Sequence, residues 1–320
     1  MHLVKFEQGA EIMVIVRAMG GLGNQLQQYA LYRKLEHIGK DVRLDISWFR
    51  NEALQASMAA GRELELDYLN RLPYKVASEE EIRSVLGRLW EEPENFAGKI
   101  KRKLHPALST FFEESDMYHG QIFSMNDKYL VGYWACEKYY ADIMNVLRAD
   151  ITFPHSADSG TESRNREMIQ QMEETCSVSV HIRRGDYLDD SNKALFGGIC
   201  TEAYYRKATE YMRERFPDAR FFIFSDDIPY VKEHYQGKEY QIIDWNHGKD
   251  SFYDMMLMSR CRHNICANST FSFWGARLNP CDGKVMIRPS IHKNTQVCIP
   301  EQMKELWQGW LLITPYGEML

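Results

Sequence analysis

The chain has 320 residues, of which 44% are apolar, 12% aromatic and 26% charged. This is the composition of a folded globular protein, because aromatic side chains bury enough surface to offset chain entropy, and the length suggests about two domains. The net charge of −6, with 39 Lys and Arg against 45 Asp and Glu, argues against a non-specific nucleic-acid binder, whose surface must be basic.

The cysteines and the N-terminal residues exclude several further classes. The 7 cysteines are odd in number and form no Cys-x-x-Cys pair, so we expect reduced, mostly buried thiols. The first apolar run, 12–16, is too short for a signal-peptide core, and no uncharged apolar stretch approaches the roughly 18 residues of a membrane span. We therefore expect a cytoplasmic protein that meets a membrane only peripherally.

The chain opens with the alternation of a parallel α/β fold. After a loose leader at 1–11, we expect a buried strand over 12–17, a helix over 25–39 and a second strand over 41–47. The glycine-rich turn 18–25 joins the first strand to the helix. A strand–helix–strand unit implies parallel strands with a right-handed crossover.

The middle of the chain predicts an insertion and a domain boundary. Residues 78–115 are charge-rich and are expected to form a solvated helical insertion, and 127–147 predicts a strand followed by an amphipathic helix. The segment 154–163 is small, polar and unpatterned. We place the boundary there, which divides the chain into domains 1–155 and 156–320.

The second half repeats the alternation. The expected strands are 176–183, 219–225, 240–245, 263–267 and 284–289, and the expected helices are 201–216, 250–260, 270–278 and 301–310. The last helix could pack back on the first half. The predicted fold is therefore α/β, with two doubly wound Rossmann-like units.

The first candidate site is the turn GGLGNQ (20–25), which lies between a strand and a helix. Open α/β sheets place ligands at this point, and a helix N-terminus offers free N–H groups to an anion. Gly21 and Gly23 let a ligand approach the backbone closely, and Asn24 and Gln25 offer amides to a sugar or phosphate. A purely structural tight turn is the alternative.

A dinucleotide site is a competing interpretation of this turn. Asp45, at the end of the second strand, would then accept the ribose hydroxyls. The pattern fails at Leu26, where helix–strand packing in such sites needs a small residue, and no Gly-Lys-Ser/Thr follows to form a phosphate-binding P-loop.

The second candidate site is HIRRGDY (181–187), also at a strand end. The planar guanidinium of arginine suits bidentate contact with phosphate. Side chains alternate along an extended segment, so one of Arg183 and Arg184 can face a cleft and the other inward. Asp186 could hold a guanidinium or act as a base. The alternatives are a structural Arg–Asp pair and an integrin-type Arg-Gly-Asp motif, which the preceding strand and missing secretion signal disfavour.

Two more strand ends carry candidate nucleotide ligands. FSDD (224–227) offers carboxylates that could accept two donors from a guanine edge, although capping of a helix is a strong alternative. The NST triplet stands where a strand gives way to a helix, so it can cap the helix and expose N–H groups to phosphate. These candidates are Ser225, Asp226, Asp227, Asn268, Ser269 and Thr270.

Together and in this order, these stretches resemble the α-1,2-fucosyltransferases of glycosyltransferase family 11. The matching stretches are GGLGNQLQQYA (20–30), GYWACEKYY (132–140), HIRRGDY (181–187), FSDD (224–227) and DMMLMSRCRHNICANSTFSFWGARLN (254–279). They span nearly the whole chain. The departures from the family's usual residues are Gln27, Ala135, Cys136 and Arg277.

The resemblance implies a glycosyltransferase B architecture, with two Rossmann-like domains facing a cleft. The N-terminal domain is then the acceptor side, and the C-terminal domain binds GDP-L-fucose. The implied reaction is inverting transfer of L-fucose to the 2-hydroxyl of a terminal β-galactoside, in synthesis of a surface glycan or O-antigen. A lipid-linked acceptor would supply the peripheral membrane contact. Arg183 matches the arginine that holds the donor diphosphate, and His181 belongs to the same donor-binding motif. Asn24 matches an amide that reaches the donor or reaction centre.

The sequence contains no Asp-x-Asp pair, which metal-dependent sugar transferases use to hold Mg²⁺ or Mn²⁺. We therefore expect no metal and no other cofactor. The charge on the departing GDP must then be met by Arg183, with help from Arg184 and the helix start at 268–270.

The acceptor hydroxyl must lose a proton, normally to a carboxylate or imidazole within hydrogen-bond reach. Asp186 is our choice for this base. The weaker alternatives are Asp189, Asp190 and His181, and the donor phosphate itself could take the proton.

Two other classes of function stay open. The first is a non-catalytic nucleotide-sugar or glycan-binding protein of the same fold, which fucose release from GDP-fucose, with and without a galactoside, would distinguish from an enzyme. The second is a nicotinamide-dependent oxidoreductase, which predicts binding of NADH.

Overall fold

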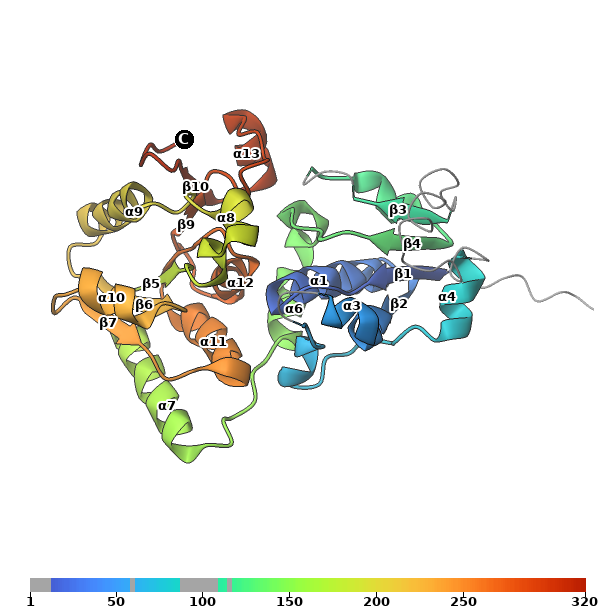
Figure 1. Cartoon of the computed structure of the whole chain (residues 1–320), viewed down its shortest axis with the longest axis horizontal. Coiled ribbons are helices and arrows are strands. Elements are labelled where there is room, and N and C mark those ends of the chain that lie inside the picture. The colour runs from blue at the N-terminus through green and yellow to red at the C-terminus, as the bar shows by residue number, and fades with distance from the viewer. Residues whose placement is uncertain (1–12, 58–60, 87–108, 114–116) are drawn as a thin grey trace, which may run out of the picture.

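The computed structural model describes residues 13–57, 61–86, 109–113 and 117–320. They form two α/β domains that lie side by side, each built on one parallel sheet (Figure 1). The expected leader and most of the expected charge-rich insertion fall outside the described residues. The α/β fold class is confirmed.

The described part of the N-terminal domain contains a parallel sheet with strand order β2-β1-β4-β3. Its strands are β1 (Met13–Arg17), β2 (Asp41–Asp45), β3 (Thr110–Phe112) and β4 (Lys128–Val131). Its α-helices are α1 (Leu22–His37), α2 (Ser47–Arg50), α3 (Glu52–Ala56), α4 (Glu79–Leu86) and α6 (Met144–Asp150). Its short 3-10 helices are η1 (Glu65–Tyr68), η3 (Gly120–Ser124), η4 (Glu137–Tyr139) and η5 (Ala141–Ile143).

The C-terminal domain contains a larger parallel sheet with strand order β10-β9-β8-β5-β6-β7. Its strands are β5 (Ser177–Ile182), β6 (Arg220–Ser225), β7 (Tyr240–Ile243), β8 (His263–Ile265), β9 (Met286–Pro289) and β10 (Trp310–Ile313). Its α-helices are α7 (Ser159–Glu174), α8 (Asp190–Phe196), α9 (Glu202–Arg215), α10 (Ile228–His234), α11 (Phe252–Arg260), α12 (Thr270–Leu278) and α13 (Pro300–Leu306). Its 3-10 helices are η6 (Asp186–Leu188) and η7 (Gly248–Ser251).

The order of strands fixes where a ligand can bind. In the N-terminal sheet the chain moves outward from β1 to β2, and β4 pairs on the other side of β1. In the C-terminal sheet the order reverses in the same way between β5 and β8. A crevice opens beyond the carboxyl ends of parallel strands at such a reversal. The loops after β1, β5 and β8, which carry the glycine, arginine and NST motifs, all start at these two points.

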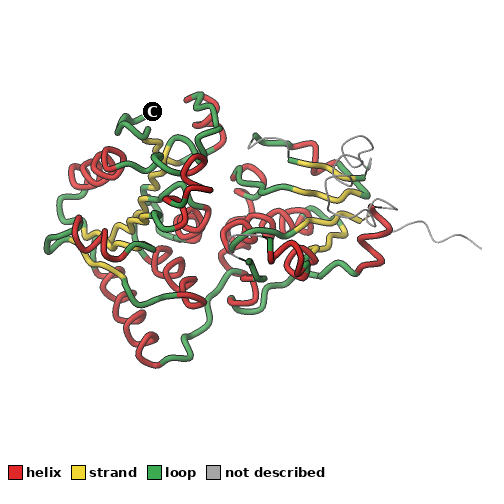
Figure 2. Tube along the Cα trace, in the orientation of Figure 1, coloured by secondary structure: helices red, strands yellow, loops and turns green. Residues whose placement is uncertain are grey.

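Several elements differ from the prediction (Figure 2). The helix expected over 301–310 ends at Leu306, because Gly309 takes a φ of +82° and turns the chain into β10 beside β9. Helix α7 begins inside the segment expected to be an unpatterned boundary, where Asp158 accepts a hydrogen bond from the Thr161 N–H at 2.7 Å. Capping residues and first turns are polar, so the start of α7 resembles a loop in sequence.

Smaller differences follow from short elements with weak patterns. The segment expected to be a helix after β4 first forms η4 and η5, and α6 begins only at Met144. Helix α1 begins at Leu22, so Gly23 and Asn24 belong to its first turn and not to the preceding loop. Strand β3 and helices α2, α3, α8 and α10 have no counterpart in the prediction. The division of the chain at residue 155 stays a prediction; residues 151–158 connect α6 to α7.

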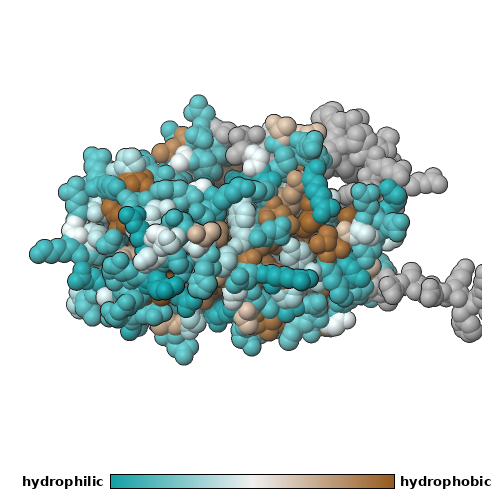
Figure 3. Space-filling model, turned by 90° about the horizontal axis from the view of Figure 1, so that it is seen from below, coloured by the Kyte–Doolittle hydropathy of each residue, from teal (hydrophilic) through white to brown (hydrophobic). Residues whose placement is uncertain are grey.

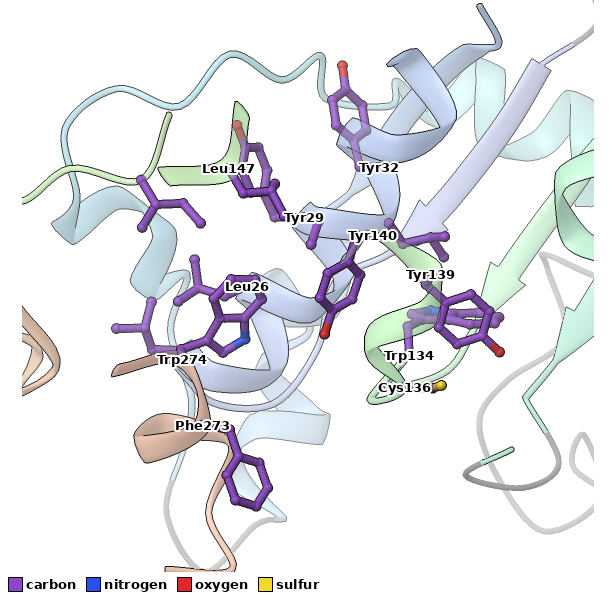
Figure 4. Packing of buried hydrophobic residues seen from close by; sticks show 14 of the residues in the cluster. Leu26, Tyr29, Tyr32, Trp134, Cys136, Tyr139, Tyr140, Leu147, Phe273 and Trp274 are labelled. Atoms are coloured by element: carbon purple, nitrogen blue, oxygen red, sulfur yellow. The ribbon is translucent and has the colours of Figure 1, made fainter. Parts of the chain in front are cut away.

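One hydrophobic cluster runs through both domains. It joins residues of α1, η4 and α6 to residues of α11, α12, α13 and β10 (Figure 4). Leu26 of α1 is fully buried in the same cluster as Trp274 of α12. Leu26 therefore packs in the interface between the domains, which is why a large residue stands where a dinucleotide site needs a small one. Asp45, the ribose acceptor in that interpretation, is buried and accepts hydrogen bonds from Ser47 and Tyr129.

A buried ion pair crosses the same interface. The Nε of Arg277 in α12 lies 2.7 Å from Oε1 of Glu137, and the same oxygen accepts the indole N–H of Trp310 at 2.8 Å. Arg277 Nη2 also donates to the backbone oxygen of Ala135 at 3.1 Å. Two of the departures from the family pattern, Ala135 and Arg277, are therefore in direct contact. Lys138, next to Glu137, also forms an ion pair with Glu305 of α13.

The described structure has a mostly hydrophilic face (Figure 3) and contains no disulfide bond. The face seen in Figure 3 is mostly hydrophilic, with smaller groups of hydrophobic residues. Among the described residues, no helix combines the length and apolar character needed to cross a membrane. All seven cysteines are unpaired.

The two domains approach each other closely at Gly23. A β-carbon at this position would lie 2.5 Å from Thr270 Oγ1 and 2.6 Å from the backbone nitrogen of Phe271. Real β-carbons do not approach other atoms so closely, so only glycine lets the first turn of α1 touch the first turn of α12.

We expect Gly23→Ala to destabilise the protein by about 1–3 kcal/mol, the usual cost of forcing a methyl group into a packed contact. The measurement is the free energy of unfolding from urea denaturation. Gly21→Ala is the matched control, because a β-carbon there meets its nearest atom, Arg62 Nη1, at an ordinary 3.5 Å. Equal losses in the two variants would show that the helix contact does not limit stability.

Candidate functional site

A cavity of about 550 Å³ lies between the two domains, where the loops after β1, β5 and β8 meet. The N-terminal domain lines it with Gly21, Leu22, Gly23, Asn24, Arg62 and Glu65. The C-terminal domain lines it with residues that include His181, Arg183, Asp186, Ser225, Asp226, Asp254, Ser269, Thr270 and Phe271. The expected arrangement, two Rossmann-like domains that face a cleft as in glycosyltransferases of type B, is confirmed.

Arg183 is held in this cavity by two carboxylates. Its Nη2 and Nε lie 2.8 Å and 3.0 Å from Oδ1 of Asp186, and its Nη1 lies 3.1 Å from Oδ2 of Asp226. The side chain keeps 31% of its surface exposed. A guanidinium has five N–H donors, so donors remain for a ligand after these contacts. The pairs fix the orientation of Arg183 before any ligand binds.

Asp186 faces Arg183 through Oδ1, as in the structural Arg–Asp pair that the sequence left as an alternative, and these contacts give its role as the base no support. Two of the alternative bases, Asp189 and Asp190, do not line the cavity.

The two arginines diverge as the strand pattern predicts. Arg184 does not line the cavity: its Nε lies 3.0 Å from Oδ2 of Asp227, and its guanidinium lies 3.7 Å from the ring centre of Tyr230. Asp227 also caps α10 by accepting the Tyr230 N–H at 3.1 Å. The structure thus contradicts a direct ligand role for Arg184 and Asp227.

Asp226 and Ser225 line the cavity, but both oxygens of the Asp226 carboxylate contact groups of the two arginines. Its Oδ1 accepts the backbone N–H of Arg184 at 2.9 Å, and its Oδ2 faces Arg183. A β-carbon on Gly185 would lie 2.5 Å from this Oδ2, so the glycine lets the turn close around Asp226. The pairing of Asp226 with the arginines gives no support to a guanine contact of the FSDD carboxylates, which stays a prediction. Ser225 accepts the Asp227 N–H at 3.0 Å through its hydroxyl.

Two helix N-termini face the cavity. Helix α12 starts at Thr270 with Ser269 as its N-cap residue, and helix α1 starts at Leu22 after Gly21. Ser269 makes no capping hydrogen bond and Gly21 has no side chain to make one, although Glu65 accepts the Leu22 N–H at 3.1 Å. Uncapped N–H groups and the helix dipole favour an anion at such positions.

Asn268 and Gln25 do not reach the cavity, which corrects their prediction as ligands. The Nδ2 of Asn268 donates to the backbone oxygens of Phe196 and His292, at 3.2 Å and 3.1 Å. Gln25 is fully buried: its Nε2 donates to the backbone oxygens of Gly20 and Glu63, and its Oε1 accepts from the Leu66 N–H. Both amides hold loops together.

His181 and Asp254 are titratable groups in the cavity wall without a charged partner in contact. Burial, and then the nearby charge of Arg183, lower the pKa of His181 to about 3, so its imidazole is neutral. Its Nδ1 is buried without a hydrogen-bond partner. Burial raises the pKa of Asp254 to about 7, although Asn246 donates to its Oδ1 at 2.9 Å.

A family model and a close relative identify the chain. The model of glycosyltransferase family 11 matches residues 111–312. An α-1,2-colitosyltransferase of Escherichia coli is 33% identical over 286 residues, which cover 87% of this chain and 91% of that protein. The chain belongs to glycosyltransferase family 11.

Two further proteins are similar to this family 11 glycosyltransferase. The O-antigen biosynthesis glycosyltransferase WbnK of E. coli is 26% identical, and the match covers 84% of this chain and 91% of that protein. The solved structure of fucosyltransferase NodZ from Bradyrhizobium aligns with a TM-score of 0.46 at 13% identity, over 83% of this chain and 92% of that chain.

The structure thus brings together most of the site expected for a family 11 enzyme. Gly21, Gly23, Asn24, His181 and Arg183 line one cavity. Asp186, Ser225, Asp226, Ser269 and Thr270 line it as well. Within the described residues, no group of three His, Cys, Asp or Glu side chains is placed to hold a metal ion. The independence from metal stays a prediction.

Sequence reasoning missed Arg62, Glu65 and Asp254. The first two precede and begin η1, a segment with no strand or glycine motif before it. Asp254 opens a stretch that resembles the family, but a single acid in the first turn of α11 looks like an ordinary helix residue.

We expect Asp254→Asn to change stability in a pH-dependent way. The folded protein holds this carboxyl with a pKa raised from 3.8 to about 7, so its contribution to stability is full below pH 3.8 and is lost as pH rises through about 7. The variant cannot lose this contribution. The difference in Tm, variant minus wild type, should therefore rise between about pH 4 and pH 7 and then level off. A difference that stays constant over this range would contradict the raised pKa.

Proposed function

We propose that this glycosyltransferase transfers L-fucose from GDP-L-fucose, with inversion, to the 2-hydroxyl of a terminal β-galactoside. The single observation that carries the proposal is Arg183, fixed by Asp186 and Asp226 beside the uncapped N-terminus of α12. A fixed guanidinium and free backbone N–H groups together suit a diphosphate. They also stabilise the negative charge that develops when a nucleoside diphosphate leaves.

Asp254 supports guanine as the base of the donor. A guanine edge presents two neighbouring N–H donors, and a carboxylate can accept both. The other acids of the C-terminal cavity wall, Asp186 and Asp226, already bind Arg183, whereas Asp254 has only an amide as partner. Hydrogen bonds from the base would favour the ionised form of Asp254 and so bring its pKa down from about 7.

The sugar of the donor has a second candidate. A relative that is 33% identical over most of both chains is called an α-1,2-colitosyltransferase. Colitose is L-fucose without its 3-hydroxyl, so the two sugars share the hydroxyl-free C6 methyl group and differ by one polar group. The donor is therefore GDP-L-fucose or, as the alternative, GDP-colitose.

The acceptor would enter from the N-terminal domain, because the proposed donor contacts lie on the C-terminal domain. The name of WbnK, an O-antigen biosynthesis enzyme, supports a galactose-terminated O-antigen repeat as acceptor. Such a repeat is built on a lipid carrier, so we place the enzyme in the cytoplasm, with peripheral contact to the inner face of the membrane through the acceptor. The charge on GDP is met by Arg183 and helix N-termini, so we propose turnover without a metal ion.

The decisive experiment is incubation of the enzyme with GDP-L-fucose or GDP-colitose and a panel of β-galactosides, followed by linkage analysis of the product. We expect an α-1,2-linked deoxyhexose on galactose, at the same rate in EDTA as with added Mn²⁺. Transfer to another hydroxyl, or only donor binding without transfer, would overturn the proposed reaction. Activity that appears only with Mn²⁺ would overturn the metal-free assignment.

Arg183→Lys should lower kcat by about 100-fold or more at saturating donor, the usual effect of removing one preorganised donor to a developing anion. Lysine keeps the charge but cannot reach two carboxylates and a phosphate with one planar group. Arg184→Lys is the matched control, because Arg184 contacts Asp227 and Tyr230 outside the cavity. Similar kcat values for the two variants would remove Arg183 from its proposed role.

A further inference from the structure

Glu65 brings a carboxylate into the cavity from the N-terminal domain. It is the first residue of η1, and its Oε2 accepts the backbone N–H of Leu22, the first residue of α1, at 3.1 Å. The other oxygen, Oε1, makes no hydrogen bond to any described residue, and it would lie 3.7 Å from a β-carbon on Gly21. One oxygen is therefore fixed and the other is available to a ligand in the cavity.

Glu65 differs from the other acids of the cavity wall in its partners. Asp186 and Asp226 are paired with Arg183, and Asp254 accepts the side-chain amide of Asn246. Within the described part of the chain, no basic side chain lies within ion-pair distance of Glu65. Among the described residues that line the cavity, it is also the one acid that comes from the N-terminal domain.

The geometry of the reaction requires a base on this side. In an inverting transfer, the acceptor oxygen attacks the anomeric carbon from the face opposite the leaving group, and the base lies on the face of attack. The proposed contacts of the leaving diphosphate, Arg183 and the N-terminus of α12, belong to the C-terminal domain. We therefore expect the acceptor and its base on the side of the cavity that the N-terminal domain lines.

Glu65 also lies beside the contact between the two helix N-termini. Its partner Leu22 precedes Gly23, and Gly23 is packed against the backbone of Thr270 and Phe271 at the start of α12. The carboxylate is thus seated on one of the two helix N-termini that meet in the cavity, while the diphosphate would be bound at the other.

We propose that Glu65 is the general base of the transfer, an inference that rests on the function proposed above. The acceptor oxygen forms a bond to the anomeric carbon, and the bond from this carbon to the β-phosphate oxygen breaks. GDP leaves with the electron pair of that bond. The acceptor hydroxyl gives its proton to Oε1 of Glu65, which later releases it to solvent.

The surroundings of Glu65 suit this task. Burial raises its pKa, whereas the hydrogen bond from Leu22, and then the charge of Arg62, oppose the rise; Glu63 adds a repulsive charge. A raised pKa makes a carboxylate a stronger proton acceptor. The other titratable or charged groups that line the cavity are His181, Arg183, Asp186, Asp226, His247 and Asp254.

The test compares Glu65→Gln and Glu65→Asp with wild type in transfer from saturating donor to a β-galactoside. Glutamine keeps an oxygen for the Leu22 N–H but cannot take a proton, and aspartate keeps a carboxylate on a shorter side chain. We expect kcat to fall by about 100-fold or more in Glu65→Gln, the usual contribution of a general base, with Glu65→Asp in between. Binding of GDP, measured by calorimetry, should be unchanged, which also shows that the variants are folded.

The pH profile of kcat gives a second measurement. At saturating donor, the guanine proposed to bind Asp254 would hold it ionised, so we assign the acidic limb of the wild-type profile to the base and expect Glu65→Gln to lack this limb. Glu63→Gln is the matched control, because Glu63 is an exposed neighbour that pairs with Lys249 outside the cavity.

The outcomes separate the two levels of the proposal. A Glu65→Gln enzyme that keeps its kcat within about tenfold and its acidic limb would overturn the role of Glu65 and leave the proposed transfer intact. Higher activity in Glu65→Gln than in Glu65→Asp would do the same, since it points to a purely structural bond to Leu22. No transfer by the wild type from either donor would overturn the proposed function itself, and with it the base.

Discussion

The contact between the first turns of α1 and α12 is the constraint on which the rest of the structure depends. Gly23 lies against the backbone of Thr270 and Phe271, so two helix N-termini from different domains meet without a side chain between them. The N-terminus of α12 offers uncapped N–H groups to the cavity, whereas the first N–H of α1 is bonded to Glu65. The hydrophobic cluster that includes Leu26 and Trp274 holds the two helices together below this contact. An anion site between domains therefore follows from packing as well as from the choice of polar residues.

The carboxylates around the cavity are divided by their partners. Asp186 and Asp226 bind Arg183, and Asp227 binds Arg184, so these acids orient cations and cap a helix. Asp254 and Glu65 have no arginine in contact, and burial raises the pKa of both. Burial without a cation destabilises the ionised form of a carboxylate. A hydrogen-bond donor supplied by a ligand would stabilise that form again. Burying Asp254 and Glu65 without a cation costs stability, which is a reason to assign both residues to ligand binding and chemistry.

The interface between the domains carries its own buried charges. Arg277 and Glu137 form an ion pair, and Oε1 of Glu137 also accepts the indole N–H of Trp310. A buried pair is weak support for stability, because desolvation offsets much of the attraction, but it requires one relative position of its two partners. The pair joins α12, whose N-terminus lies at the cavity, to η4 and β10. The position of the cavity wall is thus coupled to the packing of the last strand.

The sequence by itself determined the α/β class, the parallel strands and the strand ends whose loops line the cavity. Buried strands, glycine-rich turns and the motif around Arg183 can each be recognised from a short stretch of sequence. It also showed that Leu26 excludes a dinucleotide site. Only the tertiary structure decided which polar residues face the cavity: Gln25, Arg184 and Asn268 point elsewhere, whereas Glu65 and Asp254 point in. The order of strands and the pairing of Asp226 and Asp227 with arginines depend on residues that are far apart in the sequence. No local pattern encodes them, because residues distant in sequence set them when the two sheets pack.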